Sequence, residues 1–284
     1  SAAVTLEGNH VTGNASGRSG GGVYVESDDA RLVDNAICGN ATTNVSDGGG
    51  IAIGNTSAAT LERNTITGNT ADRNGGGLSV GDLTAVTLTN NVIAGNVCCG
   101  ASAWVGGAGA WLGSGDHVLI HNTVADNAGG DGAGIRLYGD AALTNTIIAN
   151  QTVGLVAASA GAEATLEGTL WHGNGQDADG PGTVVTGTVD HHADPAFVDP
   201  GSADYHLTEG SPAIDAGVPS GVGDDLDGDT RPRGLTYDVG ADETLDPVVP
   251  PAGVSISGPV TGLVETMVTF SATVEPITAT LPSY

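Results

Sequence analysis

Lysine is absent from this sequence, and seven arginines stand against 33 aspartates and glutamates, so the formal net charge is −26. Such an excess of negative charge repels phosphate backbones and anionic membrane surfaces. Long hydrophobic runs are also absent, because no stretch approaches the roughly 18 apolar residues of a membrane-spanning helix. We therefore expect neither a nucleic-acid partner nor direct insertion of this segment into a membrane.

Bulky side chains are scarce as well, since 284 residues include only 3 Trp, 5 Tyr, 2 Phe and 1 Met beside 47 Gly. So few large groups do not fill the single thick core of an ordinary globular enzyme. Hydrophobic residues still make up 39% of the chain, mostly as Ala, Val, Leu and Ile, which suits many thin aliphatic layers. The composition therefore predicts a repeat protein.

Cysteine is limited to Cys38, Cys98 and Cys99, which are too few for a disulfide framework and lack the spacing of a zinc site. The adjacent Cys98 and Cys99 could form a vicinal disulfide, or one of them could bond to Cys38. The absence of lysine and the abundance of Thr, Asn and Gly are typical of extracellular proteins. We expect an extracellular or cell-surface location.

A nine-residue motif, L-x-x-N-x-(V/I)-x-x-N, recurs at residues 6–14, 32–40, 61–69, 88–96 and 119–127, with degenerate copies at 142–150 and 166–174. Asparagine tolerates left-handed backbone geometry at bends, and stacked Asn amides can hydrogen-bond from one repeat to the next. The first Asn of each copy is therefore expected to form a structural ladder, made of Asn9, Asn35, Asn64, Asn91, Asn122 and Asn145.

Between the motif copies lies a second element, a glycine pair followed by an alternating run such as GVYV at 22–25 and GIAI at 50–53. Alternation of apolar and other residues predicts strands with one side chain inward and the next outward. Three short strands per coil of about 25 residues, stacked roughly 4.8 Å apart, describe an all-β fold, the parallel β-helix.

The pattern over residues 1–175 resembles the right-handed parallel β-helix proteins of the pectate-lyase-like superfamily. Downstream, residues 194–217 (DPAFVDPGSADYHLTEGSPAIDAG), 225–234 (DLDGDTRPRG) and 237–243 (YDVGADE) resemble the C-terminal signature of choice-of-anchor Q proteins. This resemblance implies a bacterial surface or secreted β-helix that carries a cell-attachment signal. It also implies that residues 176–245 supply terminal coils and a cap at the end of the solenoid.

The C-terminal part differs in composition. Residues 246–253 are expected to form a Pro-rich, semi-rigid linker. Residues 254–284 resemble the opening of a bacterial Ig-like or PKD-like domain, with strands expected over 254–257 and 266–273. Because these residues are too few for a complete β-sandwich, either the rest of the sandwich is missing or another chain completes it.

The outward positions of the glycine-pair strands carry the candidate ligand-binding residues. This column reads Tyr24, Ala52, Ser79, Trp111, Arg136 and Val156, and it contains no acidic pair of the kind that glycosidases use. Arg136 is the best candidate base for a pectate-lyase-like elimination but has no evident carboxylate cluster beside it. We assign no catalytic residue, and we expect ligand or partner contacts from Tyr24, Trp104, Trp111 and Arg136.

Alternating aspartates, Asp225, Asp227 and Asp229 around Gly228, resemble the start of an oxygen-rich Ca²⁺ loop. The alternative is a simple turn in which Arg231 or Arg233 pairs with the carboxylates. His191, His192 and Asp194 are a weaker candidate for a transition metal, because adjacent residues of a strand point to opposite faces. Asn44 and Asn55 are the N-x-S/T sequons that we expect to be free for glycosylation.

These features favour a structural or adhesive β-solenoid of a bacterial surface, including the possibility of a filament or sheath subunit. Expected partners are further copies of the chain, or a cell-surface or polysaccharide ligand. Ca²⁺ is the one expected cofactor. Two alternatives stay open: a polysaccharide lyase or glycoside hydrolase, and a passive carbohydrate-binding spacer.

Overall fold

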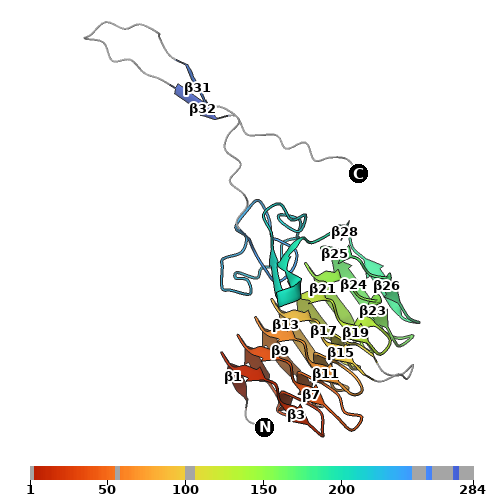
Figure 1. Ribbon diagram of the computed structural model, residues 1–284. Coiled ribbons are helices and arrows are strands. Elements are labelled where there is room, and N and C mark those ends of the chain that lie inside the picture. Colours follow the sequence, from red (N-terminus) through yellow and green to blue (C-terminus); the bar gives the residue numbers. More distant parts are fainter. Residues whose placement is uncertain (1–2, 55–57, 100–105, 245–253, 258–270, 275–284) are drawn as a thin grey trace, which may run out of the picture. The chain divides into compact units, whose positions relative to one another are not determined.

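The computed structural model describes residues 3–54, 58–99, 106–244, 254–257 and 271–274. The chain divides into two compact units, Ser1–Asp246 and Pro247–Tyr284. The described part of the first unit consists of strands, with one short 3₁₀ helix, η1 (Pro200–Ser202), and no α-helix. Its strands stack as a parallel β-helix (Figure 1). The prediction of an all-β parallel solenoid is confirmed.

Four parallel sheets form the walls of the solenoid. Sheet 1 contains β1 (Thr5–Glu7), β5 (Ala30–Val33), β9 (Ala58–Glu62), β13 (Ala85–Thr89), β17 (His117–Ile120), β21 (Ala141–Thr144), β24 (Glu163–Glu167) and β27 (Thr183–Thr186). Sheet 2 contains β2 (His10–Thr12), β6 (Ala36–Cys38), β10 (Thr65–Thr67), β14 (Val92–Ala94), β18 (Thr123–Ala125), β22 (Ile147–Ala149), β25 (Thr169–His172) and β28 (Asp190–His192).

The other two walls follow the second Asn of each motif. Sheet 3 contains the two-residue strands β3 (Ala15–Ser16), β7 (Ala41–Thr42), β11 (Thr70–Ala71), β15 (Val97–Cys98) and β19 (Ala128–Gly129). Sheet 4 contains β4 (Val23–Val25), β8 (Ile51–Ile53), β12 (Leu78–Val80), β16 (Ala110–Leu112), β20 (Ala133–Leu137), β23 (Val153–Ala157) and β26 (Gln176–Asp179). The prediction of three strands per coil missed sheet 3, because two-residue strands are too short to show alternation.

Stacked aliphatic side chains fill the interior of the solenoid. Leu6, Leu32 and Leu61 pair in register along sheet 1, and the column continues through Leu88, Leu119, Leu143 and Leu166. Ile37 and Ile66 pair in the same way along sheet 2, and neither has any exposed surface. Each coil thus buries a thin aliphatic layer and depends on its neighbours for the rest of its contacts.

The first asparagine ladder runs from Asn9 through Asn35, Asn64 and Asn91 to Asn122. At each step the side-chain oxygen of one Asn accepts the backbone N–H and the amide Nδ2–H of the Asn one coil earlier, for example at 3.1 and 2.9 Å between Asn35 and Asn64. These Asn side chains are buried from Asn35 onward. The amides therefore pair backbone groups at a bend where no sheet pairing is available.

Asn145 does not belong to this ladder, which corrects the prediction. Ile120 pairs with Thr144, so Asn145 lies level with His121, and Thr146 takes the ladder position. Asn145 instead accepts the backbone N–H of Val218 at 2.8 Å and donates to its carbonyl at 2.7 Å. Asn145 and Asn150 have the five-residue spacing of the motif, but strand register shifts this copy by one residue, so Thr146 and Gln151 take the two ladder positions.

A second ladder follows the last Asn of the motif, from Asn14 to Asn127, and continues where the motif degenerates. The backbone N–H of Asn127 donates to Gln151 Oε1 at 3.1 Å, and the backbone N–H of Gln151 donates to Asn174 Oδ1 at 3.0 Å. Gln151 substitutes for Asn because its amide carries the same acceptor and donor groups.

Residues 194–244, which we call the flanking segment, fold back along the outside of the solenoid (Figure 1). The segment contains η1 and an antiparallel pair, β29 (Phe197–Asp199) and β30 (Asp204–Leu207). Its buried residues pack against outward side chains of sheet 2, namely Val92, Ala94, Ala125, Ile147, Ala149 and Leu170. Residues 176–192 do supply terminal strands, but the expected cap at the end is instead a cover along one side.

Polar contacts attach the flanking segment to coils far away in the sequence. Tyr205 donates its hydroxyl to Asp126 at 2.9 Å, and the backbone N–H of Ala241 donates to Thr123 Oγ1 at 3.1 Å. Arg63 Nη1 donates to Asp224 at 2.9 Å. The flanking segment therefore ties early and late coils together.

In the second unit, β31 (Val254–Ser257) and β32 (Ser271–Val274) form an antiparallel pair. The first strand agrees with the expected bounds. The second strand overlaps the expected 266–273 at residues 271–273. Residues 266–270 lie outside the described residues, as does the linker at 246–253. One antiparallel pair does not test the resemblance to an Ig-like domain, which stays a prediction.

His121 lies fully buried between the solenoid and the flanking segment, with Nε2 2.8 Å from Ser220 Oγ. Burial, together with the nearby charge of Arg231, lowers the pKa of His121 to about 3. Between this value and about 6.5 the unfolded chain binds a proton that the folded chain rejects, so stability falls as the pH falls. We expect this group to remove roughly 1.4 kcal/mol per pH unit over the window from about 6 to 4.

His121→Asn tests this expectation, because Asn90 and Asn145 occupy the equivalent left-handed position in neighbouring coils. Urea unfolding at several pH values should give the variant a shallower loss of stability on acidification than the parent. His10→Asn, at an exposed histidine, should keep the parent's slope. Equal slopes for parent and His121→Asn would contradict the assignment.

Candidate functional site

The outward column of sheet 4 carries the predicted ligand-binding residues. Strand pairing places Tyr24, Ala52, Ser79, Trp111 and Arg136 side by side in that order. Tyr24 is 52% exposed, whereas Ala52 and Ser79 are small and nearly buried. Two aromatic residues are thereby separated by three coil spacings, about 14 Å, with small residues between them.

A shallow hollow of about 280 Å³ lies between these two aromatic residues. We call it the sheet 4 hollow. Tyr24 and Trp111 stand at its ends, and Ala52 and Ser79 form part of its floor. Further polar lining residues are Ser19, Asp47, Arg73 and Asp82. Arg73 and Asp47 form an ion pair. The hollow therefore offers two aromatic groups and a set of polar groups on one face.

Trp111 is held in place by the next coil. Its ring lies 5.2 Å from the ring of Tyr138, measured between centroids, and the rings are tilted by 45°. Contacts of this geometry favour aromatic pairs. The indole orientation is therefore largely set before any ligand arrives.

Arg136 offers no free guanidinium to a ligand. It is only 8% exposed, forms an ion pair with Asp131 and donates to the Tyr138 hydroxyl at 3.3 Å. A guanidinium bound in this way is neither an available base nor an open ligand contact. We therefore leave Arg136 out of the sheet 4 hollow, although it supports Tyr138 beneath Trp111.

The remaining predicted residues of the solenoid have different outcomes. Trp104 and Asn55 lie outside the described residues. Asn44 is exposed and adopts a left-handed backbone conformation. Cys98 and Cys99 do not form the proposed disulfide: both thiols are free, Cys98 is buried and Cys99 is exposed. Cys98 ends β15 and is buried, whereas Cys99 follows the strand at an exposed position.

The aspartate loop does not gather its three carboxylates as predicted. Asp225 is fully buried, and its Oδ1 accepts the backbone N–H groups of Asp227 and Asp229 at 2.9 and 2.8 Å. Its Oδ2 accepts the backbone N–H of Glu243 at 2.9 Å. Asp229 pairs with Arg233. Asp225 therefore shapes the turn, as in the alternative interpretation.

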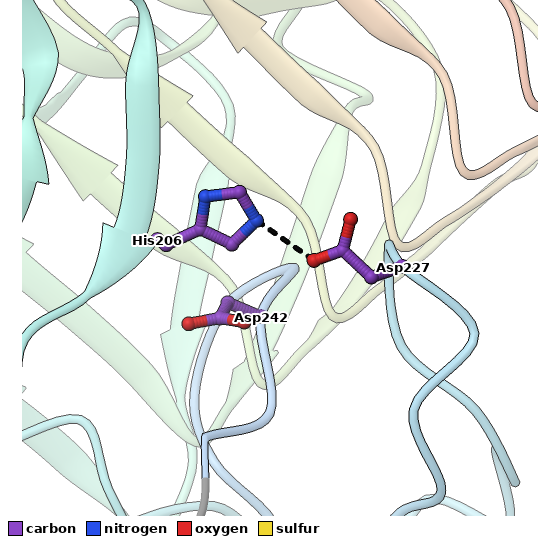
Figure 2. Close-up of side chains that lie close together, drawn as sticks. All are labelled: His206, Asp227 and Asp242. Carbon is purple, nitrogen blue, oxygen red and sulfur yellow. Dashed lines mark hydrogen bonds and ion pairs between the residues drawn. The ribbon is translucent and has the colours of Figure 1, made fainter.

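Asp227 instead points toward His206 (Figure 2). His206 Nε2 lies 2.7 Å from Asp227 Oδ2, and its Nδ1 lies 2.6 Å from Asp204 Oδ1. Burial by itself would lower the pKa of His206, but hydrogen bonds to Asp204 and Asp227 and the charge of Asp242 raise it to about 9.

The other histidine candidates do not come together. His191 Nε2 contacts the carbonyl oxygen of Ala216 at 3.0 Å, whereas His192 lies 3.5 Å from Asp177 and 3.4 Å from Asp190. Asp194 lies 3.8 Å from His172. The two adjacent histidines thus face opposite sides of β28, as their alternation predicts.

Residues 1–171 match the family described as "Right handed beta helix region". The chain belongs to this right-handed β-helix family. No curated protein and no solved structure matches the chain. The described residues contain no helix that is long and apolar enough to cross a membrane. Membership in the family establishes the fold. This fold occurs in enzymes and in non-enzymes and is compatible with surface and polysaccharide-related roles.

In this β-helix the acidic residues of the sheet 4 hollow already have partners. Asp47 pairs with Arg73, and Asp82 Oδ1 accepts the backbone N–H of Ser114 at 3.2 Å. A glycosidase needs one carboxyl group as acid and a second as base or nucleophile across the scissile bond. The paired Asp47 suits ligand positioning better than acid–base work.

Proposed function

We propose that this chain is a rigid structural and adhesive module of an extracellular bacterial surface, and that its sheet 4 hollow binds a polysaccharide. The observation that carries the proposal is the pair Tyr24 and Trp111, aligned in one outward column with Ala52 and Ser79 between them. Small residues between two aromatic groups leave room for a ligand chain lying along the solenoid axis.

The chemistry of the sheet 4 hollow favours sugars. Aromatic faces pack against the apolar C–H faces of sugar rings, and the neighbouring Asp47, Arg73 and Asp82 can hydrogen-bond to hydroxyl groups. The net charge of −26 disfavours polyanionic ligands. We therefore propose a neutral polysaccharide as the ligand to which the module adheres.

Self-association stays part of the proposal. The pair β31–β32 is a two-stranded sheet within the described residues of the second unit, and such sheets have edges that can pair with strands of another chain. Strand exchange between the second units of neighbouring chains would link copies of the solenoid into a filament or sheath.

Tyr24→Ala tests the sugar site, because the side chain is largely exposed and its removal should leave the core intact. In affinity electrophoresis against a panel of neutral polysaccharides, we expect the parent to be retarded by at least one of them. Loss of one stacking face should weaken that binding at least tenfold, or about 1.4 kcal/mol. Tyr24→Phe should retain most of the affinity because it keeps the ring.

The control variant is Val118→Ala, on the outward face of sheet 1 and away from the sheet 4 hollow. It should bind like the parent. Binding that survives Tyr24→Ala unchanged would overturn the proposed site. Release of reducing ends or of unsaturated sugars from the retained polysaccharide would favour the enzyme alternative, with Asp47 and Asp82 as the first residues to replace.

A further inference from the structure

Three chain segments meet at one point of the flanking segment, outside the sheet 4 hollow. His206 lies on β30, Asp227 lies in the aspartate loop, and Asp242 lies near the end of the first unit (Figure 2). One ligand atom from each of these side chains lies within 4.8 Å of the other two. A tetrahedral cation with bonds of about 2.0–2.2 Å holds its ligand atoms roughly 3.3–3.6 Å apart, so small side-chain shifts would let these three atoms surround a single ion.

From this geometry we propose that His206, Asp227 and Asp242 form a binding site for a divalent transition metal of the Zn²⁺ class. The site is separate from the predicted Ca²⁺ loop, of which it uses only Asp227. It is independent of the sugar-binding proposal, because none of its three residues lines the sheet 4 hollow.

The surroundings of His206 are those of a metal-binding imidazole. Asp204 Oδ1 holds Nδ1 at 2.6 Å, which leaves Nε2 directed at Asp227 and the cluster. Metal-binding histidines characteristically donate their second ring N–H to a carboxylate, which fixes the ring and increases the basicity of the ligating nitrogen. Asp204 would have this positioning role.

Asp242 supplies the second, independent observation. It is only 8% exposed, and among the described residues the hydrogen bond given to its carboxylate comes from the backbone N–H of Leu207, at 2.7 Å to Oδ2. A largely buried carboxylate is stabilised by a nearby cation, and within the described residues no backbone N–H occupies its second oxygen. A metal ion beside Nε2 of His206 would provide that cation.

The donor set selects the kind of metal. Ca²⁺ and Mg²⁺ prefer all-oxygen sites, whereas one imidazole with two carboxylates suits Zn²⁺ and its neighbours in the first transition row. Three protein ligands leave a position for water. The bound ion would join β30, the aspartate loop and the last turn of the flanking segment.

The test uses the full chain after removal of metals, titrated calorimetrically with ZnCl₂ and, separately, with CaCl₂. We expect one Zn²⁺ per chain that is lost in His206→Gln and in Asp227→Asn, and at least tenfold weaker Zn²⁺ binding in Asp204→Asn, as for other partners of metal-bound histidines. Ca²⁺ should not compete. With Co²⁺ as probe, visible absorption bands should appear in the parent and vanish in His206→Gln.

His192→Gln is the matched control, since His192 also lies between two carboxylates, Asp177 and Asp190. It should bind Zn²⁺ like the parent. The proposal fails if the parent binds no Zn²⁺, if His206→Gln binds it as tightly as the parent, or if His192→Gln alone abolishes binding. Equal affinity for Ca²⁺ would also overturn it, by pointing to an oxygen-only site.

Discussion

Replacing Arg231 with Met is expected to lower the free energy of unfolding by about 3–5 kcal/mol. The side chains of Arg231 and Glu243 have no exposed surface, and Nη1 lies 2.7 Å from Oε2. Arg231 also donates to the carbonyl of Gly240 at 2.9 Å. The variant would leave the Glu243 carboxylate buried without its counter-ion, together with an unpaired backbone acceptor.

The loss should appear first in the flanking segment. Urea unfolding measures the change in free energy, and hydrogen exchange locates it. The amide of Gly240, bonded to the Asn145 carbonyl at 2.9 Å, should lose protection before the amides of sheet 1. The double variant Arg231→Met with Glu243→Leu should regain only part of the lost stability, because removing Glu243 leaves the backbone N–H groups of Arg233 and Asp238 without their acceptor.

Arg233→Gln is the matched control, since Arg233 pairs with the exposed Asp229 and exposed ion pairs contribute at most about 1 kcal/mol. Similar losses in Arg231→Met and Arg233→Gln would mean that the buried pair has no special role. Unchanged protection of Gly240 in Arg231→Met would show that the pair does not hold the flanking segment.

Asn64→Ala should be the second strongly destabilising change, by about 3 kcal/mol or more. The Asn64 amide accepts two N–H groups from Asn35 and donates to Asn91 Oδ1 at 3.0 Å and to the Leu32 carbonyl at 2.9 Å. Alanine would remove the acceptor of the buried Asn35 backbone N–H and a donor to the Leu32 carbonyl, and it would leave Asn91 Oδ1 with only the backbone N–H of residue 64.

Asn9→Ala provides the comparison, because Asn9 is only partly buried and donates to Asn35 without accepting from another ladder residue within the described chain. Its loss should cost about 1 kcal/mol or less. Chemical unfolding of both variants, followed by circular dichroism, gives the two values. Equal effects would imply that the ladder adds little beyond the packing of the aliphatic column.

The solenoid was predictable from local sequence because its rules act over a few residues and then repeat. Leu61 and Ile66 point inward, as the corresponding residues of the neighbouring copies do, and Asn64 stands at the bend between them. A single misplaced residue shows the limit of this reasoning. Asn145 was assigned to the ladder, but strand register puts Thr146 there, and register depends on pairing with the preceding coil.

The sequence contains evidence for the flanking segment, although the repeat motif by itself does not reveal it. In β14 and β22 the outward residues are apolar, as in the runs VIA and IIA, so both sides of these strands are hydrophobic. Strands buried on both faces require a covering layer. The first coils of sheet 2 carry His10 and Thr12 outward and are exposed there. The change along the sheet indicates where a cover begins.

The sequence by itself determined the repeat, the inward aliphatic columns and the polar character of the bends, since alternation and Asn spacing are encoded within one coil. Only the tertiary structure decided which distant groups meet. His206, Asp227 and Asp242 are brought together by a segment that folds back on the solenoid. In the aspartate loop, by contrast, the Asp225 carboxylate accepts backbone N–H groups of the same turn and is not available to a metal ion. The reason is that buried backbone N–H groups need hydrogen-bond acceptors.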